Sequence, residues 1–87
     1  MASDDDLLSR ILRGTSDANI AFTQLRSLLR RMGFAERIRG DHHIFSKTGV
    51  VEIINLQPIG SKAKPYQVKQ VRGLIVKYRL AGADHEE

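Results

Sequence analysis

The chain has 87 residues, enough for one domain with a single small core. It contains 41% hydrophobic and 28% charged residues and no cysteine, which indicates a globular protein and excludes disulfides, thiolate catalysis and cysteine-ligated zinc. No apolar run approaches the length of a membrane span, and the aspartates near the N-terminus are unlike a basic secretion signal. We therefore expect a cytoplasmic protein with no membrane partner.

The net charge of +4 is unevenly distributed along the chain. All 14 lysines and arginines lie between Arg10 and Arg79, where only four acidic residues oppose them, so this span carries a net charge of +10. The other six acidic residues lie towards the two ends. A small domain this basic favours a polyanionic partner, of which nucleic acid is the commonest; the alternative is a solvated surface that aids solubility.

A short helix is predicted near the N-terminus, within an extension that spans residues 1–19. Ser3 followed by three aspartates suits a helix start, because the hydroxyl can cap free amides and carboxylates suit the positive end of the helix dipole. The apolar residues then fall on one face: Leu7, Leu8, Ile11 and Leu12. Gly14 can end the helix. We expect this helix to pack against the rest of the domain, with partner binding as the alternative.

A second helix follows a loop that the composition predicts over residues 14–19. Thr23 is the predicted cap, and Phe22 before it is a possible hydrophobic staple residue. The apolar positions repeat at helical spacing: Leu25, Leu28, Leu29 and Met32. Three arginines take the opposite face, either as a solvated surface or as an RNA contact: Arg26, Arg30 and Arg31. Gly33 can adopt the left-handed conformation that ends the helix.

Three short strands are predicted next: residues 34–38, 41–46 and 50–56. The third is rich in Val and Ile, which favour strands. Arg39 and Gly40 are predicted to form the first tight turn, since Gly40 can adopt a positive φ, and residues 47–49 the second. The strands should therefore form an antiparallel meander.

A third helix is predicted after a loop over residues 58–64, in which Pro58 and Gly60 interrupt regular structure. Pro65 suits the first turn of this helix, where its missing amide costs nothing. The apolar stripe of the helix consists of Val68, Val71, Leu74, Ile75 and Tyr78. Residues 81–87 read as an acidic tail.

The predicted fold class is α+β, with a three-stranded antiparallel sheet in the order α-β-β-β-α and an extra short N-terminal helix. The main domain should span residues 20–80. Two helices can cover one face of such a sheet and leave its other face or its rim open. This is the element order of a double-stranded-RNA-binding fold, although order alone does not establish function.

Two adjacent histidines in the second predicted strand are the most chemically informative feature, because histidine alone changes charge near neutral pH. Neighbours in a strand point to opposite faces, so His42 shares a face with Ile44, and His43 shares one with Phe45. Phe45 is the better core candidate. We therefore expect His43 to be packed or at the edge and His42 to be open.

An open histidine among cations could cleave RNA, which carries its own nucleophile in the 2′-hydroxyl group. No metal or other cofactor is needed for this chemistry. The candidate phosphate-binding cations are Arg39, Lys62, Lys64 and Lys69. A zinc site is disfavoured, because adjacent histidines splay apart and no cysteine or nearby third histidine completes the ligand set.

The motifs that carry a family resemblance are Gly33-Phe34, Gly40-Asp41-His42-His43-Ile44-Phe45 and Lys64-Pro65 before the last helix. Together they resemble the HicA toxins of bacterial HicA–HicB toxin–antitoxin pairs, over about residues 22–80. In that family the motif reads Gly-Ser-His, followed two residues later by an aromatic, and its histidine is the catalytic residue of a small ribonuclease that cuts mRNA.

The resemblance implies that His42 is catalytic and that the fold is double-stranded-RNA-binding-like. It further implies activity without a known metal requirement and inhibition by a HicB-like antitoxin that covers the active site. In this reading Gly40 lets the RNA backbone approach closely. Tyr66 and Gln67 are candidate RNA contacts, with packing at the helix start as the alternative for Tyr66.

One departure from the family pattern is Asp41, which stands where the family usually has Ser. A carboxylate beside His42 favours the protonated imidazole and repels phosphate. It could tune the acid step of cleavage or mark a lapsed active site. Two alternatives to a ribonuclease are therefore a non-catalytic RNA-binding module and a protein-interaction module that docks an acidic partner.

Overall fold

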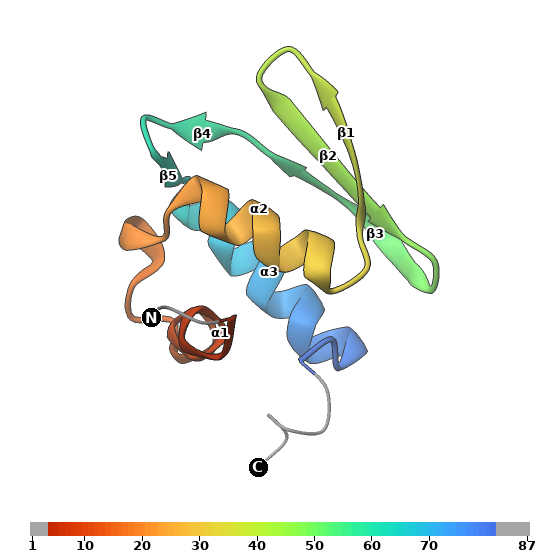
Figure 1. Cartoon of the computed structure of the whole chain (residues 1–87). Coiled ribbons are helices and arrows are strands. Elements are labelled where there is room, and N and C mark those ends of the chain that lie inside the picture. Colours follow the sequence, from red (N-terminus) through yellow and green to blue (C-terminus); the bar gives the residue numbers. More distant parts are fainter. Residues whose placement is uncertain (1–3, 82–87) are drawn as a thin grey trace.

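The computed structural model describes residues 4–81, which form an α+β domain (Figure 1). Its helices are α1 (Asp4–Arg13), α2 (Phe22–Arg31) and α3 (Pro65–Tyr78), with a 3₁₀ turn, η1, at Asp17–Asn19. Its strands are β1 (Ala35–Arg39), β2 (His42–Lys47), β3 (Val50–Leu56), β4 (Pro58–Ile59) and β5 (Lys62–Ala63). No described helix is both long and apolar enough to cross a membrane. The predicted Ser3 cap and residues 82–87 of the predicted tail lie outside the described residues.

The main sheet has the order β1-β2-β3, and both strand pairs are antiparallel, as predicted. Its register places Phe45 opposite Glu36 on one side and opposite Ile54 on the other. Residues directly opposite one another share a face, so this row belongs to the inner face of the sheet. Arg39 lies opposite His42, on the outer face.

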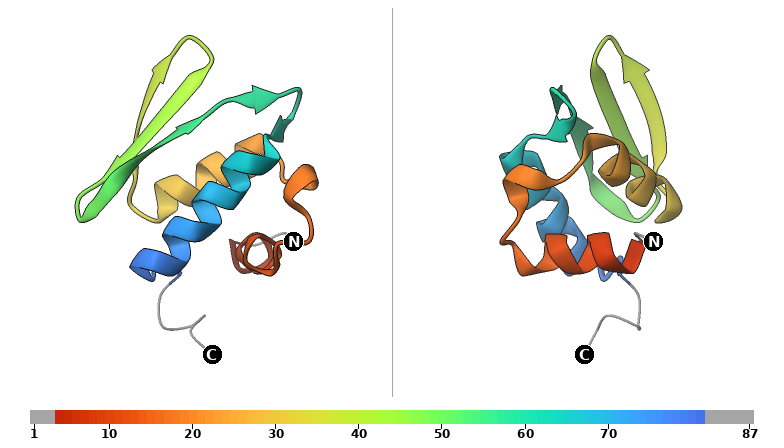
Figure 2. Two further views of the ribbon diagram at one scale, coloured as in Figure 1. Left: turned by 180° about the vertical axis from the view of Figure 1, so that it is seen from behind. Right: turned by 60° about the vertical axis from the view of Figure 1, so that its left-hand side comes forward.

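The helices lie on one side of the sheet (Figures 1 and 2). Helices α2 and α3 pack beneath its inner face, and α1 packs on the far side of these two helices. The core between sheet and helices includes fully buried Phe45, Ile54, Leu25 and Val71. Helix α1 contributes buried Leu7, Leu8 and Ile11, which confirms the predicted packing role of this helix.

The outer face of the sheet has no described helix over it (Figure 2). Strand alternation places Arg37, Arg39 and His42 at one end of this face, and Val51 and Ile53 at the other. The two apolar side chains are exposed, Val51 to 87% and Ile53 to 61%. The predicted open face is therefore present, and it carries both charged and apolar groups.

The predicted cap at Thr23 is wrong, because α2 begins at Phe22 and its N-cap residue is Ala21, two residues before Thr23, and Ala21 makes no side-chain cap hydrogen bond. The entry to the helix is held by the backbone instead. The Phe22 amide donates to the Ser61 carbonyl at 2.9 Å, and the Ala63 amide donates to the Ile20 carbonyl at 2.9 Å. Pairing with a distant segment thus replaces the side-chain cap.

The same pairing explains why the predicted loop over residues 58–64 is instead the β4–β5 hairpin, which turns at Gly60 with φ 61°. Strands of two residues are too short to leave a compositional signal, and their partner lies some forty residues earlier in the chain. The predicted loop over residues 14–19 likewise contains η1. Pro65 does begin α3, as predicted.

The predicted turn at Arg39-Gly40 is displaced by one residue. The first two strands each begin and end one residue later than predicted, so Arg39 belongs to β1 and the turn consists of Gly40 and Asp41. Gly40 has φ 63°, the conformation that a two-residue hairpin turn requires at its first position. This shift places the Arg39 backbone directly opposite His42.

Candidate functional site

His42 is the first residue of β2 and lies on the outer face of the sheet, with 48% of its side chain exposed. The prediction that His42 is open and His43 packed is confirmed, since the His43 side chain is only 16% exposed. His42 Nδ1 lies 3.2 Å from Asn55 Oδ1, which projects from β3 on the same face. The imidazole is therefore both accessible to a ligand and held in orientation.

The Asn55 contact bears on which nitrogen of His42 is chemically available. The side-chain oxygen of Asn55 accepts a hydrogen bond, so Nδ1 carries the hydrogen in this pairing. In the neutral ring this leaves a lone pair on Nε2, the atom able to take a proton from a ligand. Asp41 Oδ1 lies 3.7 Å from Nε2 and faces the positive charge that develops there on protonation.

A chain of side-chain hydrogen bonds continues from Asp41 to the cations. Gln57 Nε2 donates to Asp41 Oδ2 at 2.7 Å, and Lys64 Nζ donates to Gln57 Oε1 at 2.9 Å. The hydrogen bond from Gln57, with a weaker contribution from the positive charge of Lys64, holds the pKa of Asp41 below its ordinary value. This chain ties the β1–β2 turn to the residue that precedes α3.

The predicted phosphate-binding residues fall into two groups. Arg39, Gly40 and Lys64 belong to the surroundings of His42, and the space beside Gly40 is open, with no atom within 4 Å of where a Cβ would lie. Lys62 in β5 and Lys69 on α3 are exposed and have no side-chain partner among the described residues. The structure therefore leaves these two amines available but does not bring them into contact with His42.

A shallow hollow of about 200 Å³ lies beside His42. It is lined by His42, Asn55, Gln57, Tyr66, Gln67 and Gln70. Tyr66 is 62% exposed, so the alternative that it packs at the helix start is wrong, whereas Gln67 is buried and accepts the Gln57 amide at 3.1 Å.

Sequence reasoning missed three residues of this hollow: Asn55, Gln57 and Gln70. Alternation along β3 could have placed Asn55 on the face of His42, because it lies directly opposite Ile44, two residues along β2 from His42. Gln57 and Gln70 carry no such signal. They reach the hollow only because the segment after β3 returns over the start of α3.

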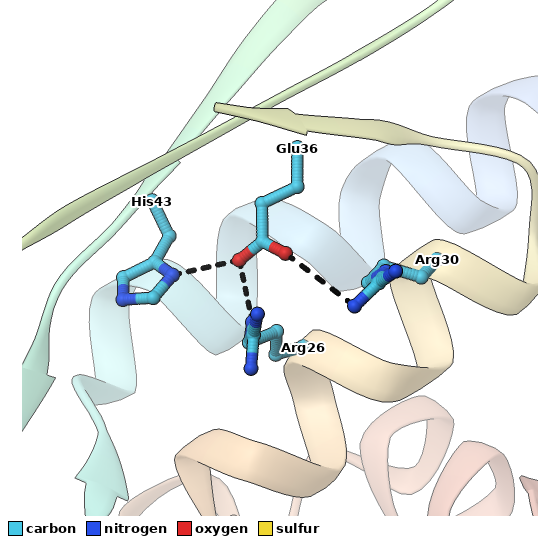
Figure 3. A network of polar contacts seen from close by, with 4 residues as sticks. All are labelled: Arg26, Arg30, Glu36 and His43. Carbon is cyan, nitrogen blue, oxygen red and sulfur yellow. Dashed lines mark hydrogen bonds and ion pairs between the residues drawn. The ribbon is translucent and has the colours of Figure 1, made fainter. Parts of the chain in front are cut away.

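A second polar network lies beneath the sheet, on its inner face (Figure 3). Glu36 has only 7% of its side chain exposed, and its Oε2 accepts hydrogen bonds from Arg26 Nε at 2.6 Å and His43 Nδ1 at 2.7 Å. Arg30 lies 3.9 Å from the other oxygen. Burial by itself raises the pKa of Glu36, but the hydrogen bonds from Arg26 and His43 outweigh it and hold the pKa below its ordinary value.

His43 also contacts the aromatic ring of Phe22 edge-on, with ring centroids 4.8 Å apart and an interplanar angle of 70°. Its ring is thus fixed between a buried carboxylate and a buried aromatic side chain. Sequence reasoning expected a packed His43 but did not find its partner Glu36, which lies on the neighbouring strand.

The residues between positions 4 and 81 contain no cluster of three or more His, Cys, Asp or Glu side chains that could hold a metal ion. The chain matches no protein-family model, no curated protein and no solved structure at a significant level.

Proposed function

We propose that this protein is a HicA-like, metal-independent endoribonuclease that cleaves mRNA in the cytoplasm and is neutralised by a HicB-like antitoxin. The observation that carries the proposal is the exposed His42, whose Nδ1 is engaged by Asn55 while Nε2 stays accessible. The motif resemblance around residues 40–45, the α-β-β-β-α order of a double-stranded-RNA-binding-like fold and the net charge of +10 between Arg10 and Arg79 support it.

In the proposed reaction, His42 Nε2 takes the proton of a 2′-hydroxyl group, and the freed oxygen attacks the adjacent phosphorus. The bond from phosphorus to the 5′-oxygen breaks, and this oxygen takes a proton from water as it leaves. The products are a 2′,3′-cyclic phosphate and a 5′-hydroxyl. The Asp41 carboxylate near Nε2 favours the imidazolium that forms after the first proton transfer.

The cations supply the electrostatic part of the reaction. Arg39 is paired with His42 across the β1–β2 hairpin, and Lys64 is linked to the neighbouring Asp41 through Gln57, so these two cations would balance charge on the reacting phosphate. Lys62 and Lys69 are exposed and unpaired among the described residues, so they would hold neighbouring phosphates of the RNA. Open space beside Gly40 would let the RNA backbone approach the turn.

The test is incubation of single-stranded mRNA with purified wild-type protein, with His42→Ala and with His85→Ala, whose position lies outside the described residues. Wild type and His85→Ala should cleave RNA in the presence of a metal chelator and leave cyclic-phosphate ends, while His42→Ala should not. Equal cleavage by wild type and His42→Ala would refute the role of His42. Rescue of cell growth by a co-expressed neighbouring gene product would test the antitoxin.

A second candidate function is RNA binding without cleavage. The Asp41 carboxylate favours it because, at 3.7 Å from Nε2, it would repel the phosphate that must approach this nitrogen for cleavage. The two functions differ in outcome. Salt-dependent RNA binding with the RNA intact after long incubation would select the binding module. Absence of RNA affinity at low salt, together with capture of an acidic protein, would instead select a protein-interaction module.

A further inference from the structure

The hollow beside His42 is small and is lined by residues of β3, the segment after β3 and α3. Tyr66 and Gln70 are four residues apart and therefore project from the same side of α3, and Asn55 from β3 lines the same hollow. Its volume of about 200 Å³ is below the ~300 Å³ at which pockets for drug-sized ligands begin. A hollow this small suits one planar ring system rather than a larger ligand.

The hollow is lined by side-chain amides rather than by charges. Apart from His42, its lining consists of one asparagine, three glutamines and one tyrosine. No lysine or arginine lines it, and Lys64 contacts one of its lining residues, since its Nζ donates a hydrogen bond to Gln57 Oε1. An uncharged, amide-rich hollow within a basic surface suits the uncharged base of a nucleotide, whose phosphate would stay outside among the cations.

Some of these amides are occupied, and others are free. Both ends of the Gln57 amide are engaged, by Asp41 and Lys64. The side-chain oxygens of Asn55 and Gln67 are engaged as well, but the NH₂ groups of these two residues have no partner among the described residues. Gln70 is exposed and both its donor and its acceptor are free. The hollow thus offers the donors and the acceptor that a base edge requires.

Tyr66 supplies an aromatic surface at the rim of the hollow. Its side chain is 62% exposed, and it stacks on no other aromatic ring among the described residues. Exposed aromatic rings beside basic residues are the usual platforms on which unpaired bases stack.

We propose that this hollow is a nucleobase subsite, in which a base stacks on Tyr66 and is read by the side-chain amides of Gln70 and Asn55. The inference rests on the RNA-binding part of the proposed function and deepens it. The base belongs to a nucleotide next to the phosphate at His42, so the subsite sets which nucleotide lies beside the cut.

The experiment is a titration of the ¹⁵N-labelled full chain with AMP, GMP, CMP and UMP, followed by NMR, with ribose 5-phosphate as the ligand without a base. The side-chain NH₂ signals of Gln70 and Asn55 and the backbone amide of Tyr66 should shift with at least one nucleotide and not with ribose 5-phosphate. Equal shifts with the base-free sugar phosphate, or no shift at these residues, would overturn the subsite.

Matched variants separate the subsite from a general effect on folding. Tyr66→Ala should weaken nucleotide binding about fivefold or more, whereas Tyr66→Phe, which keeps the ring, should bind as the wild type does. Gln70→Ala should weaken binding, and Gln24→Ala, an exposed glutamine on α2 that does not line the hollow, should not. Equal binding by Tyr66→Ala and wild type would count against the subsite.

The proposed base subsite and the proposed nuclease activity can be refuted independently of one another. Base-dependent shifts in a protein that cleaves no RNA would support the subsite and refute the catalytic proposal. Where RNA is cleaved, sequencing of the ends should show a nucleotide preference at the cut that Gln70→Ala relaxes. His42-dependent cleavage with a preference that neither Gln70→Ala nor Tyr66→Ala changes would refute the subsite alone.

Discussion

His42 and His43 are neighbours in β2, yet the sheet places them in opposite surroundings. His42 lies on the outer face, half exposed, with a weakly engaged ring next to an exposed carboxylate. His43 lies on the inner face, between the buried carboxylate of Glu36 and the ring of Phe22. Two side chains of the same type thus have different surroundings, because consecutive residues of a strand point to opposite faces of the sheet, one exposed to solvent and the other facing the protein interior.

This contrast shows why residue type alone does not identify a reactive group. A histidine that is packed and hydrogen-bonded by a buried carboxylate contributes to stability and has no access to substrate. A histidine with an accessible nitrogen can exchange protons with a ligand. Variants of the two histidines and of their partners distinguish these roles.

The largest expected effects concern His42 and His43. His42→Ala should reduce RNA cleavage about 10²- to 10⁴-fold, the usual contribution of a general acid–base. It should change the free energy of unfolding by no more than about 0.5 kcal/mol, because the side chain is exposed. His43→Ala should instead lower the free energy of unfolding by about 1–3 kcal/mol, since it removes a hydrogen-bond donor from buried Glu36.

Cleavage assays and urea denaturation of both variants measure these effects. If His43→Ala abolished cleavage and kept full stability, the assignment of roles to the two faces would be reversed.

The buried network should be the most sensitive structural element of the inner face. Glu36→Gln keeps the shape of the side chain but removes the negative charge that accepts hydrogen bonds from Arg26 and His43. Because Arg26 is one-third exposed, we expect the free energy of unfolding to fall by about 1–3 kcal/mol. Glu52→Gln provides the control, because Glu52 is one-third exposed and its partner Lys77 is largely exposed, so its loss should be smaller. Equal losses in the two variants, measured by urea denaturation, would contradict a special role for the network.

The free energy of unfolding should also decrease in acid, because protonation removes the same negative charge of Glu36. The pKa of Glu36 lies below its ordinary value of 4.5, so its contribution to stability is complete above that pH and is lost as the pH falls through the lower, folded-state value. Hydrogen bonds from Lys77 and Tyr78 lower the pKa of Glu52 to about 2, so Glu52 acts in the same direction between 4.5 and about 2.

We therefore expect the free energy of unfolding to fall as the pH decreases from about 5 to about 2 in the wild type, and to fall less in Glu36→Gln. Denaturation curves over this range provide the measurement. Parallel pH profiles for the two proteins would show that Glu36 is not the group responsible.

The hydroxyl group of Tyr78 makes polar contacts with β3, and we expect their loss to have a smaller effect on stability than the loss of the Glu36 network. Tyr78 donates its hydroxyl hydrogen to Glu52 Oε1 at 2.6 Å and accepts the Val51 amide at 3.3 Å, which joins α3 to β3. Tyr78→Phe removes both contacts and should cost about 1 kcal/mol of stability, seen in thermal or urea unfolding. Cleavage by the folded variant should be unchanged, and a large loss of activity would show that the site depends on this distant contact.

The smallest expected effect belongs to Asp41, on the outer face. Asp41→Asn removes a negative charge near the proposed phosphate position but keeps an oxygen that can accept the hydrogen bond from Gln57. RNA affinity at low salt should rise about two- to fivefold, the magnitude of one exposed charge interaction. Binding measured in the His42→Ala background keeps the RNA intact. Unchanged or weaker affinity would show that this carboxylate does not face the RNA.

The helices and strands could be predicted because their signals are local. Leu25, Leu28 and Leu29 repeat at helical spacing and are buried in α2, and Pro65 starts α3 where its missing amide is tolerated. The β4–β5 hairpin and the start of α2 could not be predicted, because each depends on backbone pairing with the other across some forty residues.

The candidate site likewise has some features that the sequence predicts and others that only the structure shows. Alternation along a strand placed His42 outside and His43 inside, since that rule needs only the position of Phe45 in the core. The orientation of the imidazole by Asn55, the link from Asp41 through Gln57 to Lys64, and the hollow beside Gln70 involve residues that are distant in sequence.

The sequence by itself determined the α+β class, the antiparallel meander, the basic charge and the face to which each histidine belongs, because periodicity and composition are properties of neighbouring residues. Only the tertiary structure decided which groups surround His42 and which carboxylate holds His43. Those partners lie on other elements, and their distances depend on the register of the strands and on how the segment after β3 returns to α3.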